Sequence, residues 1–187
     1  MFVKTKFFLL GFIFVGILIG CSTASKGILS QAERKQVDRL ITQRLYHIES
    51  DWALPLMTQG LNAVANAGLF FPGSNASRVD LIGNPNYVKV KGDSIAVYLP
   101  YFGERQMGGG YANSDSAIQF EGVPDSYEAT WNEKKQRYDI RITMKQKTET
   151  FEMNLVLFPN LSCGINVNSS HRFSIRYNGD VKPLTNE

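Results

Sequence analysis

The chain has 187 residues, of which 43% are hydrophobic and 20% are charged. This balance is typical of one globular domain and excludes a disordered chain. The formal net charge is +3, and removing a leader that contains Lys4 and Lys6 would leave +1. A charge this small provides no basic surface for DNA or RNA, so we expect no nucleic-acid partner.

The first twenty residues have the pattern of a bacterial lipoprotein signal peptide. The apolar run over residues 7–19 is too short to span a bilayer as a helix, but it fits the apolar region of a secretory signal. Leu18-Ile19-Gly20-Cys21 follows in the order apolar, any, small, cysteine. We expect cleavage between Gly20 and Cys21 and acylation of Cys21 by fatty chains such as palmitate. The alternative is an ordinary signal peptide with a chance cysteine.

The acylated cysteine would determine where the protein resides. Buried acyl methylenes hold a protein on a membrane without further contacts. Ser22 follows Cys21, so the acidic residue typical of inner-membrane retention is absent, as is the acidic cluster of some surface-exposed lipoproteins. We therefore expect an outer-membrane anchor facing the periplasm. With Cys21 acylated, Cys163 would have no disulfide partner.

The mature chain is predicted to form one domain. Residues 1–20 are the signal peptide, 21–29 a lipidated tether, 30–180 a β-rich domain and 181–187 a tail. A helix over residues 30–45 opens the domain, because Ser30 and Glu33 have capping-box spacing and apolar residues recur at helical spacing. We expect this amphipathic helix to cover one face or end of the domain; a partner-binding or membrane-surface role is the alternative.

From Tyr46 to Pro55 the apolar period changes to two residues, which indicates a strand. Glycines and prolines interrupt Met57–Asn86, which we expect to be a long ordered loop with short extended pieces such as Ser77–Ile82. Gly92-Asp93 is the turn of a hairpin. The other predicted strands are Tyr87–Lys91, Ser94–Leu99, Ser126–Trp131, Tyr138–Met144, Phe151–Leu157, Leu161–Val167 and Phe173–Tyr177.

These strands follow one another without intervening helices, which excludes parallel crossovers. The fold class is therefore mainly β: an antiparallel meander that closes to a small lipocalin-like barrel or stays a curved sheet, with one N-terminal amphipathic α-helix. The aromatic residues expected to point inward are Trp52, Tyr127, Trp131, Tyr138, Phe151 and Phe173.

Several segments carry a family resemblance. They are Val88–Ser94 followed by Val97-Tyr-Leu-Pro-Tyr-Phe-Gly103, then Tyr127–Asn132, Ile140–Ile142 and Gly164–Val167. Together they resemble a Bacteroidetes lipoprotein family known as domain of unknown function 4251, over about residues 32–177. The resemblance implies a secreted, lipid-anchored, β-rich domain with an N-terminal helix, and it supplies no catalytic residues. The stretch Thr58–Asn75 departs from it by being longer and more apolar.

Motifs for catalysis and cofactors are weak. Gly108-Gly109-Gly110 lacks the helix and the Lys-Ser/Thr pair that a phosphate loop needs, so we expect a flexible connection, with a mobile flap over the barrel mouth as the functional alternative. Four carboxylates at turns and outer faces are interpreted as solvated charges: Glu121, Asp125, Glu149 and Glu152.

Two further side-chain groups are candidate chemical sites. His47, Glu49 and Asp51 alternate on one strand face, where they could offer metal ligands but are equally typical of a solvated face. Cys163 and His171 could form a thiol–imidazole pair, but Cys163 is in phase with buried residues, which favours an inert core thiol. We expect no metal, no cofactor and no catalytic residues.

The function expected from these observations is a non-enzymatic binding or interaction module. In one version an aromatic-lined barrel interior holds a small apolar ligand. In the other, the interior is filled and the loops 56–86 and 102–116 contact another envelope protein. A hydrolase of envelope polymers, marked by paired buried carboxylates, is a third alternative. The candidate ligand or partner loop consists of Tyr101, Phe102, Gly108, Gly109, Gly110 and Tyr111.

Overall fold

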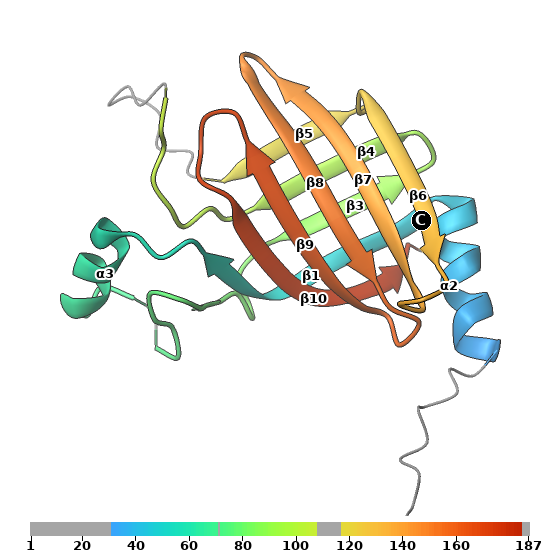
Figure 1. Cartoon of the computed structure of the whole chain (residues 1–187), viewed down its shortest axis with the longest axis horizontal. Helices are drawn as coiled ribbons and strands as arrows, with labels where there is room; N and C mark the ends of the chain where they lie inside the picture. The colour runs from blue at the N-terminus through green and yellow to red at the C-terminus, as the bar shows by residue number, and fades with distance from the viewer. Residues whose placement is uncertain (1–30, 71, 108–116, 185–187) are drawn as a thin grey trace, which may run out of the picture. The chain divides into compact units, whose positions relative to one another are not determined.

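The computed structural model describes residues 31–70, 72–107 and 117–184 (Figure 1). The chain divides into two units, 1–30 and 31–187, and the fold described here belongs to the second. Within the described residues, no helix is long and apolar enough to cross a membrane. The elements are α2 (Gln31–Gln43), β1 (Leu45–Pro55), α3 (Gln59–Asn66), β2 (Val79–Asp80), β3 (Tyr87–Lys91), β4 (Ser94–Leu99), β5 (Ile118–Gly122), β6 (Ser126–Asn132), β7 (Arg137–Gln146), β8 (Glu149–Leu157), β9 (Ser162–Ser169) and β10 (Ile175–Pro183).

The strands form one curled antiparallel sheet. Its order is β5-β4-β3-β1-β10-β9-β8-β7-β6, and β2 pairs with β1 beside this path. Two meanders, β3 to β5 and β6 to β10, are thus joined through the N-terminal strand β1. Among the described residues β5 and β6 are not paired, so the sheet is a half-barrel (Figure 1). The mainly β, antiparallel fold class is confirmed, in its curved-sheet form.

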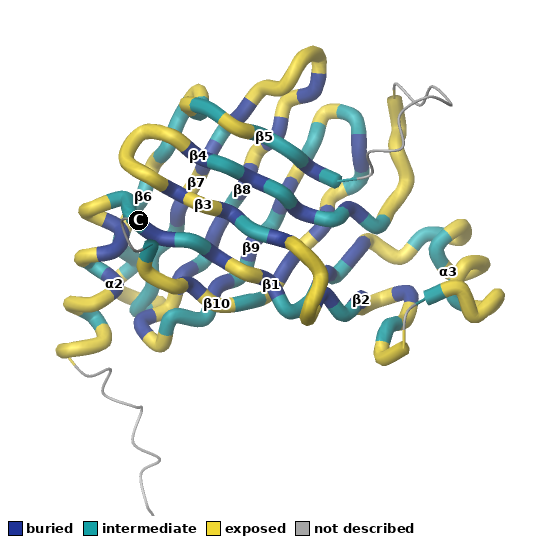
Figure 2. Tube along the Cα trace, turned by 180° about the vertical axis from the view of Figure 1, so that it is seen from behind, coloured by how far each residue is buried: buried dark blue, intermediate teal, exposed yellow. Residues whose placement is uncertain are grey.

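The core fills the concave side of this half-barrel. Apolar residues of β3 and β4 pack in one cluster with those of β7, β8 and β9, and Figure 2 shows the buried positions alternating along the strands. This alternation confirms the predicted registers of β7, β8 and β9. The buried apolar residues of β7 to β9 are Ile140, Ile142, Met144, Phe151, Met153, Leu155, Leu157, Cys163, Ile165 and Val167.

A bulge in β1 changes which aromatic residues lie inside. The register with β10 shifts between Ser50 and Trp52, opposite Gly179. A Cβ atom on Gly179 would lie 1.9 Å from the Glu49 carbonyl oxygen, so only glycine fits there. Beyond the bulge Ala53 is buried, and Trp52 turns to the other face. The predicted inward set is therefore correct in part: Phe151 is buried, and Tyr127 and Tyr138 are partly buried and pack against the core. Trp52, Trp131 and Phe173 are partly buried without belonging to the core cluster, and the buried tyrosines are Tyr46, Tyr101 and Tyr177.

Three elements differ from the sequence prediction. The helix α3 forms inside the segment expected to be a loop, with Thr58 Oγ1 accepting a hydrogen bond from the Leu61 amide as its N-cap (3.2 Å). The strand β5 was not predicted, because it is short and only Ile118 in it is buried. The last strand, β10, runs to Pro183 with Val181 buried, beyond the domain end placed at residue 180.

The helix α2 covers one end of the half-barrel, as predicted. Its residues Val37, Leu40 and Ile41 are buried in the core cluster. The Arg34 guanidinium carbon lies 3.6 Å from the centre of the Trp131 ring, and the Tyr138 hydroxyl donates to Asp38 (2.6 Å). These contacts fix the helix against β6 and β7.

Candidate functional site

Three segments lie side by side at the end of the half-barrel opposite α2 (Figures 1 and 2). They are the arm, residues 56–86 between β1 and β3; the loop 100–107; and the β9–β10 loop, residues 170–174. The Gln106 amide donates to the His171 carbonyl (2.7 Å). A Cβ atom on Gly60 would lie 2.7 Å from a carboxylate oxygen of Glu104, so α3 approaches the loop closely. We call this surface the arm end.

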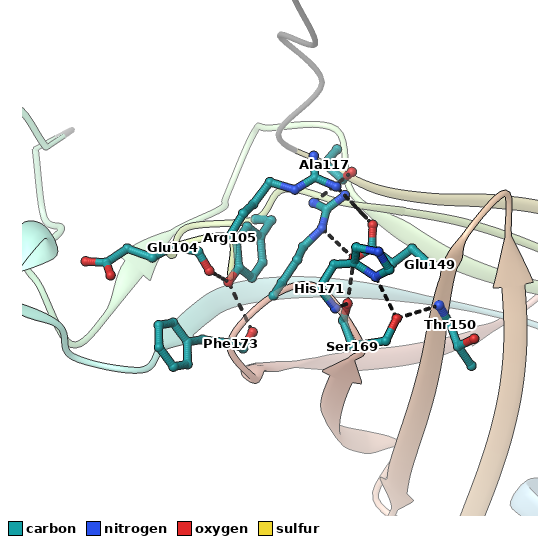
Figure 3. A network of polar contacts seen from close by, with 11 residues as sticks. Glu104, Arg105, Ala117, Glu149, Thr150, Ser169, His171 and Phe173 are labelled. Carbon is teal, nitrogen blue, oxygen red and sulfur yellow. Dashed lines mark hydrogen bonds and ion pairs between the residues drawn. The ribbon is translucent and has the colours of Figure 1, made fainter. Parts of the chain in front are cut away.

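A buried ion pair lies beneath the arm end (Figure 3). Arg172 donates from Nε and Nη2 to the two carboxylate oxygens of Glu149 (2.8 and 3.3 Å). Arg105 Nη2 and Ser169 Oγ also donate to Glu149 (3.1 and 2.5 Å). Glu149 and Arg172 are each 7% exposed. One carboxylate therefore holds three segments together: the start of β8, the loop 100–107 and the β9–β10 loop.

The buried position of Glu149 corrects the interpretation of this residue as a solvated charge. Glu149 is in phase with Phe151 and Met153 along β8, so the alternation that predicted the core also places Glu149 inside. The position of Glu149 in this alternation is the one feature of the sequence that indicates its burial. Its arginine partners come from distant loops and left no local signal.

The environment of Glu149 keeps this carboxyl ionised. Burial by itself raises the pKa of Glu149, but the hydrogen bonds from Arg172 and Ser169 and the charges of Arg172 and Arg105 outweigh it and hold the pKa below its ordinary value. A carboxyl with a lowered pKa is a poor proton donor at neutral pH. The arrangement is thus suited to fastening loops and does not resemble a general acid.

Of the predicted loop, the structure describes Tyr101 and Phe102. Tyr101 is 7% exposed, and its hydroxyl is within hydrogen-bonding distance of the carbonyl oxygens of Glu104 and Phe173 (3.0 and 3.1 Å). Tyr101 therefore braces the loops from inside. Phe102 is half-buried and lines a small pocket of about 200 Å³. The remaining predicted residues, Gly108, Gly109, Gly110 and Tyr111, lie outside the described residues.

The arm end carries most of the exposed large apolar side chains of the described residues. None of the side chains of α3 is buried. Eight large apolar side chains are exposed within the described residues, and six of them belong to the arm end. Five lie on the arm and one on the loop 100–107: Leu56, Met57, Val64, Leu69, Ile82 and Met107.

A family model described as a domain of unknown function, DUF4251, matches residues 29–181. The chain belongs to the DUF4251 family. A crystal structure of a DUF4251 family protein from Bacteroides eggerthii DSM 20697 has a similar fold, with a TM-score of 0.53 and 9% identity over 81% of this chain and 88% of that chain. At this identity the likeness shows the fold alone. No curated protein matches the chain significantly.

The family resemblance expected from the sequence is thus confirmed, and the other chemical candidates of this DUF4251 domain can be located. The described residues contain no cluster of three or more His, Cys, Asp or Glu side chains able to hold a metal. The bulge in β1 takes Asp51 out of the alternation that would have placed it beside His47 and Glu49. Glu49 itself pairs with Lys182 (2.9 Å).

Cys163 and His171 do not form a pair. Cys163 is buried near the start of β9, and burial raises the pKa of its thiol to about 12. His171 follows the other end of β9, where its Nδ1 atom lies 2.7 Å from Ser170 Oγ. The Cys163 side chain is therefore an inert part of the core, as the strand register predicted.

Proposed function

We propose that this chain is a non-enzymatic envelope lipoprotein, anchored in the outer membrane through an acylated Cys21 and facing the periplasm, whose arm end binds another envelope protein. The exposed apolar side chains of the arm carry this proposal. An eight-residue helix is marginal on its own in water, and α3 buries no side chain within its own chain. Large apolar side chains exposed together at one end of a domain are typical of a protein interface.

A protein partner fits the arm end better than a small ligand does. Core side chains from both meanders occupy the concave side of the sheet. The pocket beside Phe102 measures about 200 Å³, whereas pockets for small organic ligands usually measure roughly 300–1,000 Å³. Val79 and Leu81 of the arm belong to the core, but Leu56, Met57 and the other exposed apolar residues of the arm are available for a partner's surface to cover.

Hydrolysis has less support than binding. Paired buried carboxylates would favour a hydrolase, because one must be protonated while the other is ionised. At the arm end, the buried carboxylate of Glu149 is paired with Arg172 and Arg105 instead. Its lowered pKa removes the protonated form that a general acid needs.

The predicted anchor also favours a protein partner. Nine residues, 22–30, separate Cys21 from the start of α2. The tether is therefore joined in the chain to the first residue of α2, and the arm lies at the end of the sheet opposite α2 (Figure 1). An anchor attached there leaves the arm free to meet a protein in the periplasm.

Site-specific photo-crosslinking in living cells tests the interface. A photoreactive amino acid at Val64 or at Leu69 should give an adduct with one envelope protein, and the same group at Lys147 on the exposed β7–β8 turn should not. Charge introduced by Val64→Glu with Leu69→Glu should abolish binding of the purified partner. Equal adducts from all three positions, or adducts only with a second copy of the chain, would refute the proposed partner.

The anchor is tested separately. Mass spectrometry of the mature protein should show an N-terminal Cys21 carrying acyl chains. Cys21→Ala should leave an unprocessed precursor that is no longer retained in the membrane as a mature lipoprotein. Partitioning into a detergent phase that this substitution leaves unchanged would rule out lipidation.

A further inference from the structure

The α2 end of the half-barrel carries exposed basic side chains that form no ion pair within the described part of the chain. Lys35 and Arg39 lie one turn apart on the exposed side of α2, Lys91 ends β3, and Lys134 and Lys135 lie in the β6–β7 turn. None of these five forms an ion pair with another described residue. This excess is local, because the mature chain as a whole would have a charge near +1.

The acidic side chains around these five residues are largely neutralised by arginines. Glu33 is in the first turn of α2, where a carboxylate stabilises the helix dipole. The arginine-bound pairs at this end are Asp38 with Arg34 (3.4 Å), Glu133 with Arg34 (3.8 Å), Asp93 with Arg44 (2.9 Å) and Asp139 with Arg137 (2.8 Å). The lysines and Arg39 therefore set the sign of the exposed surface.

Lys35 and Arg39 flank a hollow of about 480 Å³ whose lining includes the apolar side chains of Ala32, Leu40 and Pro183. Two like charges four residues apart destabilise a helix in isolation. An anion between them would remove that repulsion, and an apolar floor suits the glycerol region beneath a lipid phosphate. We infer that the α2 end docks on anionic phospholipid headgroups, with a phosphate between Lys35 and Arg39.

This inference rests in part on the proposed anchor. Residues 22–30 span on the order of 35 Å at most when fully extended, so an acylated Cys21 would hold α2 within reach of the membrane surface. Headgroup contacts would then orient the domain, with the arm end directed away from the lipid. The helix predicted over residues 30–45 would then cover the core with one face and contact the membrane surface with the other.

Vesicle binding tests the inference without the anchor. Residues 31–187 form a unit with its own core, so the chain from Ser22 onward can be purified without lipid. It should co-sediment with vesicles rich in phosphatidylglycerol and not with pure phosphatidylcholine, and high salt should release it. Lys35→Glu with Arg39→Glu should lower partitioning about tenfold or more, at roughly 1 kcal/mol for each basic residue near an anionic surface. Circular dichroism should show an unchanged fold.

The matched control is Lys145→Glu with Lys147→Glu, two exposed basic residues at the β7–β8 turn. This variant should bind like the wild type. Equal losses in both variants, equal binding to both vesicle types, or no binding at all would overturn the inference. If mass spectrometry shows Cys21 unmodified, the proposed anchor fails while the vesicle result stands by itself. If lipidated protein is retained but charge reversal has no effect on vesicle binding, only the docking surface fails.

Discussion

The two helices of the domain use their apolar residues in opposite ways. The three core positions of α2, Val37, Leu40 and Ile41, are buried against the sheet, whereas α3 buries no side chain. Both helices lie at ends of the same half-barrel (Figure 2). The apolar face of α2 is therefore part of the core, whereas the apolar side chains of α3 stay outside it.

Charged side chains are buried at the arm end and exposed at the α2 end, the opposite of the apolar residues of the two helices. At the arm end an ion pair is buried and holds loops together, while at the α2 end basic side chains are exposed. The α2 end thus has buried apolar side chains and exposed basic ones. The arm end has a buried ion pair and exposed apolar side chains. Substitutions at the interior positions should cost stability, and those at the surface positions should change binding alone.

The largest expected effect concerns the buried ion pair. Glu149→Gln would leave Arg172 buried without its counter-charge, and breaking a buried pair costs about 3–5 kcal/mol. Denaturant unfolding at neutral pH should show a loss of this size. Glu152→Gln, on the exposed face of the same strand, is the control and should change stability by about 0.5 kcal/mol or less. Similar losses in both variants would mean that Glu149 is not the residue that fastens the loops.

The stability of the wild type should also depend on pH through this carboxyl. The pKa of Glu149 is lower in the folded state than its ordinary value. Its contribution is therefore fully present above the pKa of the unfolded carboxyl, roughly 4.3, and is lost as the pH falls through the lower folded value. Unfolding curves of the wild type and of Glu149→Gln should converge in acid. A difference that stays constant down to low pH would contradict this.

The second largest loss of stability is expected at the α2 end. Leu40 is 6% exposed and packs in the core cluster. Leu40→Ala should reduce the free energy of unfolding by about 2–5 kcal/mol, because a buried side chain is lost and a cavity remains. Thermal melting followed by circular dichroism measures the loss. Gln36→Ala, on the exposed side of the same helix, is the control, and an equal loss there would mean that α2 is not fixed by its apolar face.

How far the sequence predicts the fold depends on how local each signal is. The alternation along β7 and β8 is local, so both register and core were predicted. The bulge in β1 depends on Gly179 in the last strand, which no local pattern around Trp52 reveals. The helix α3 was missed because Gly60 and Gly68 obscure its short apolar period.

The same distinction applies to the candidate site. The segments 56–86 and 102–116 were predicted as contact loops from their composition, and the described parts of both lie at the arm end. The role of Tyr101 as an internal brace depends on carbonyl groups of Glu104 and Phe173. The partners of Glu149 come from two further loops, so only its position, and not its pairing, was available in the sequence.

A third prediction concerns the thiol of Cys163, which lies on the core side of β9. Cys163→Ser would bury a hydroxyl and should cost about 1–3 kcal/mol, while Cys163→Ala should be milder. Since burial raises the thiol pKa to about 12, a polar thiol reagent should label native protein slowly and denatured protein fast. Rapid labelling of the native chain would show that the strand register is wrong.

A smaller effect is expected at the β3–β4 turn, on the α2 end. Gly92 has a positive φ of 61°, and a β-branched residue there should cost about 1–2 kcal/mol. Gly92→Val should therefore lower the melting temperature, and Gly92→Asn should lower it less because asparagine tolerates this conformation better. Equal melting temperatures for the wild type and Gly92→Val would mean that the turn relaxes without strain.

The smallest effect on stability is expected on the arm, where the comparison between the two helices is most direct. Leu69 is 73% exposed, so Leu69→Ala removes little buried surface. In α3, Val64→Ala gives up a partly exposed side chain but gains helix propensity, and the two effects oppose each other. Each variant should stay within about 0.5 kcal/mol of the wild type. Since Leu40→Ala in α2 should cost several times more, a large loss from either arm variant would show that the substituted side chain packs in the core. Unchanged stability together with weaker partner binding would identify its apolar residues as an interface.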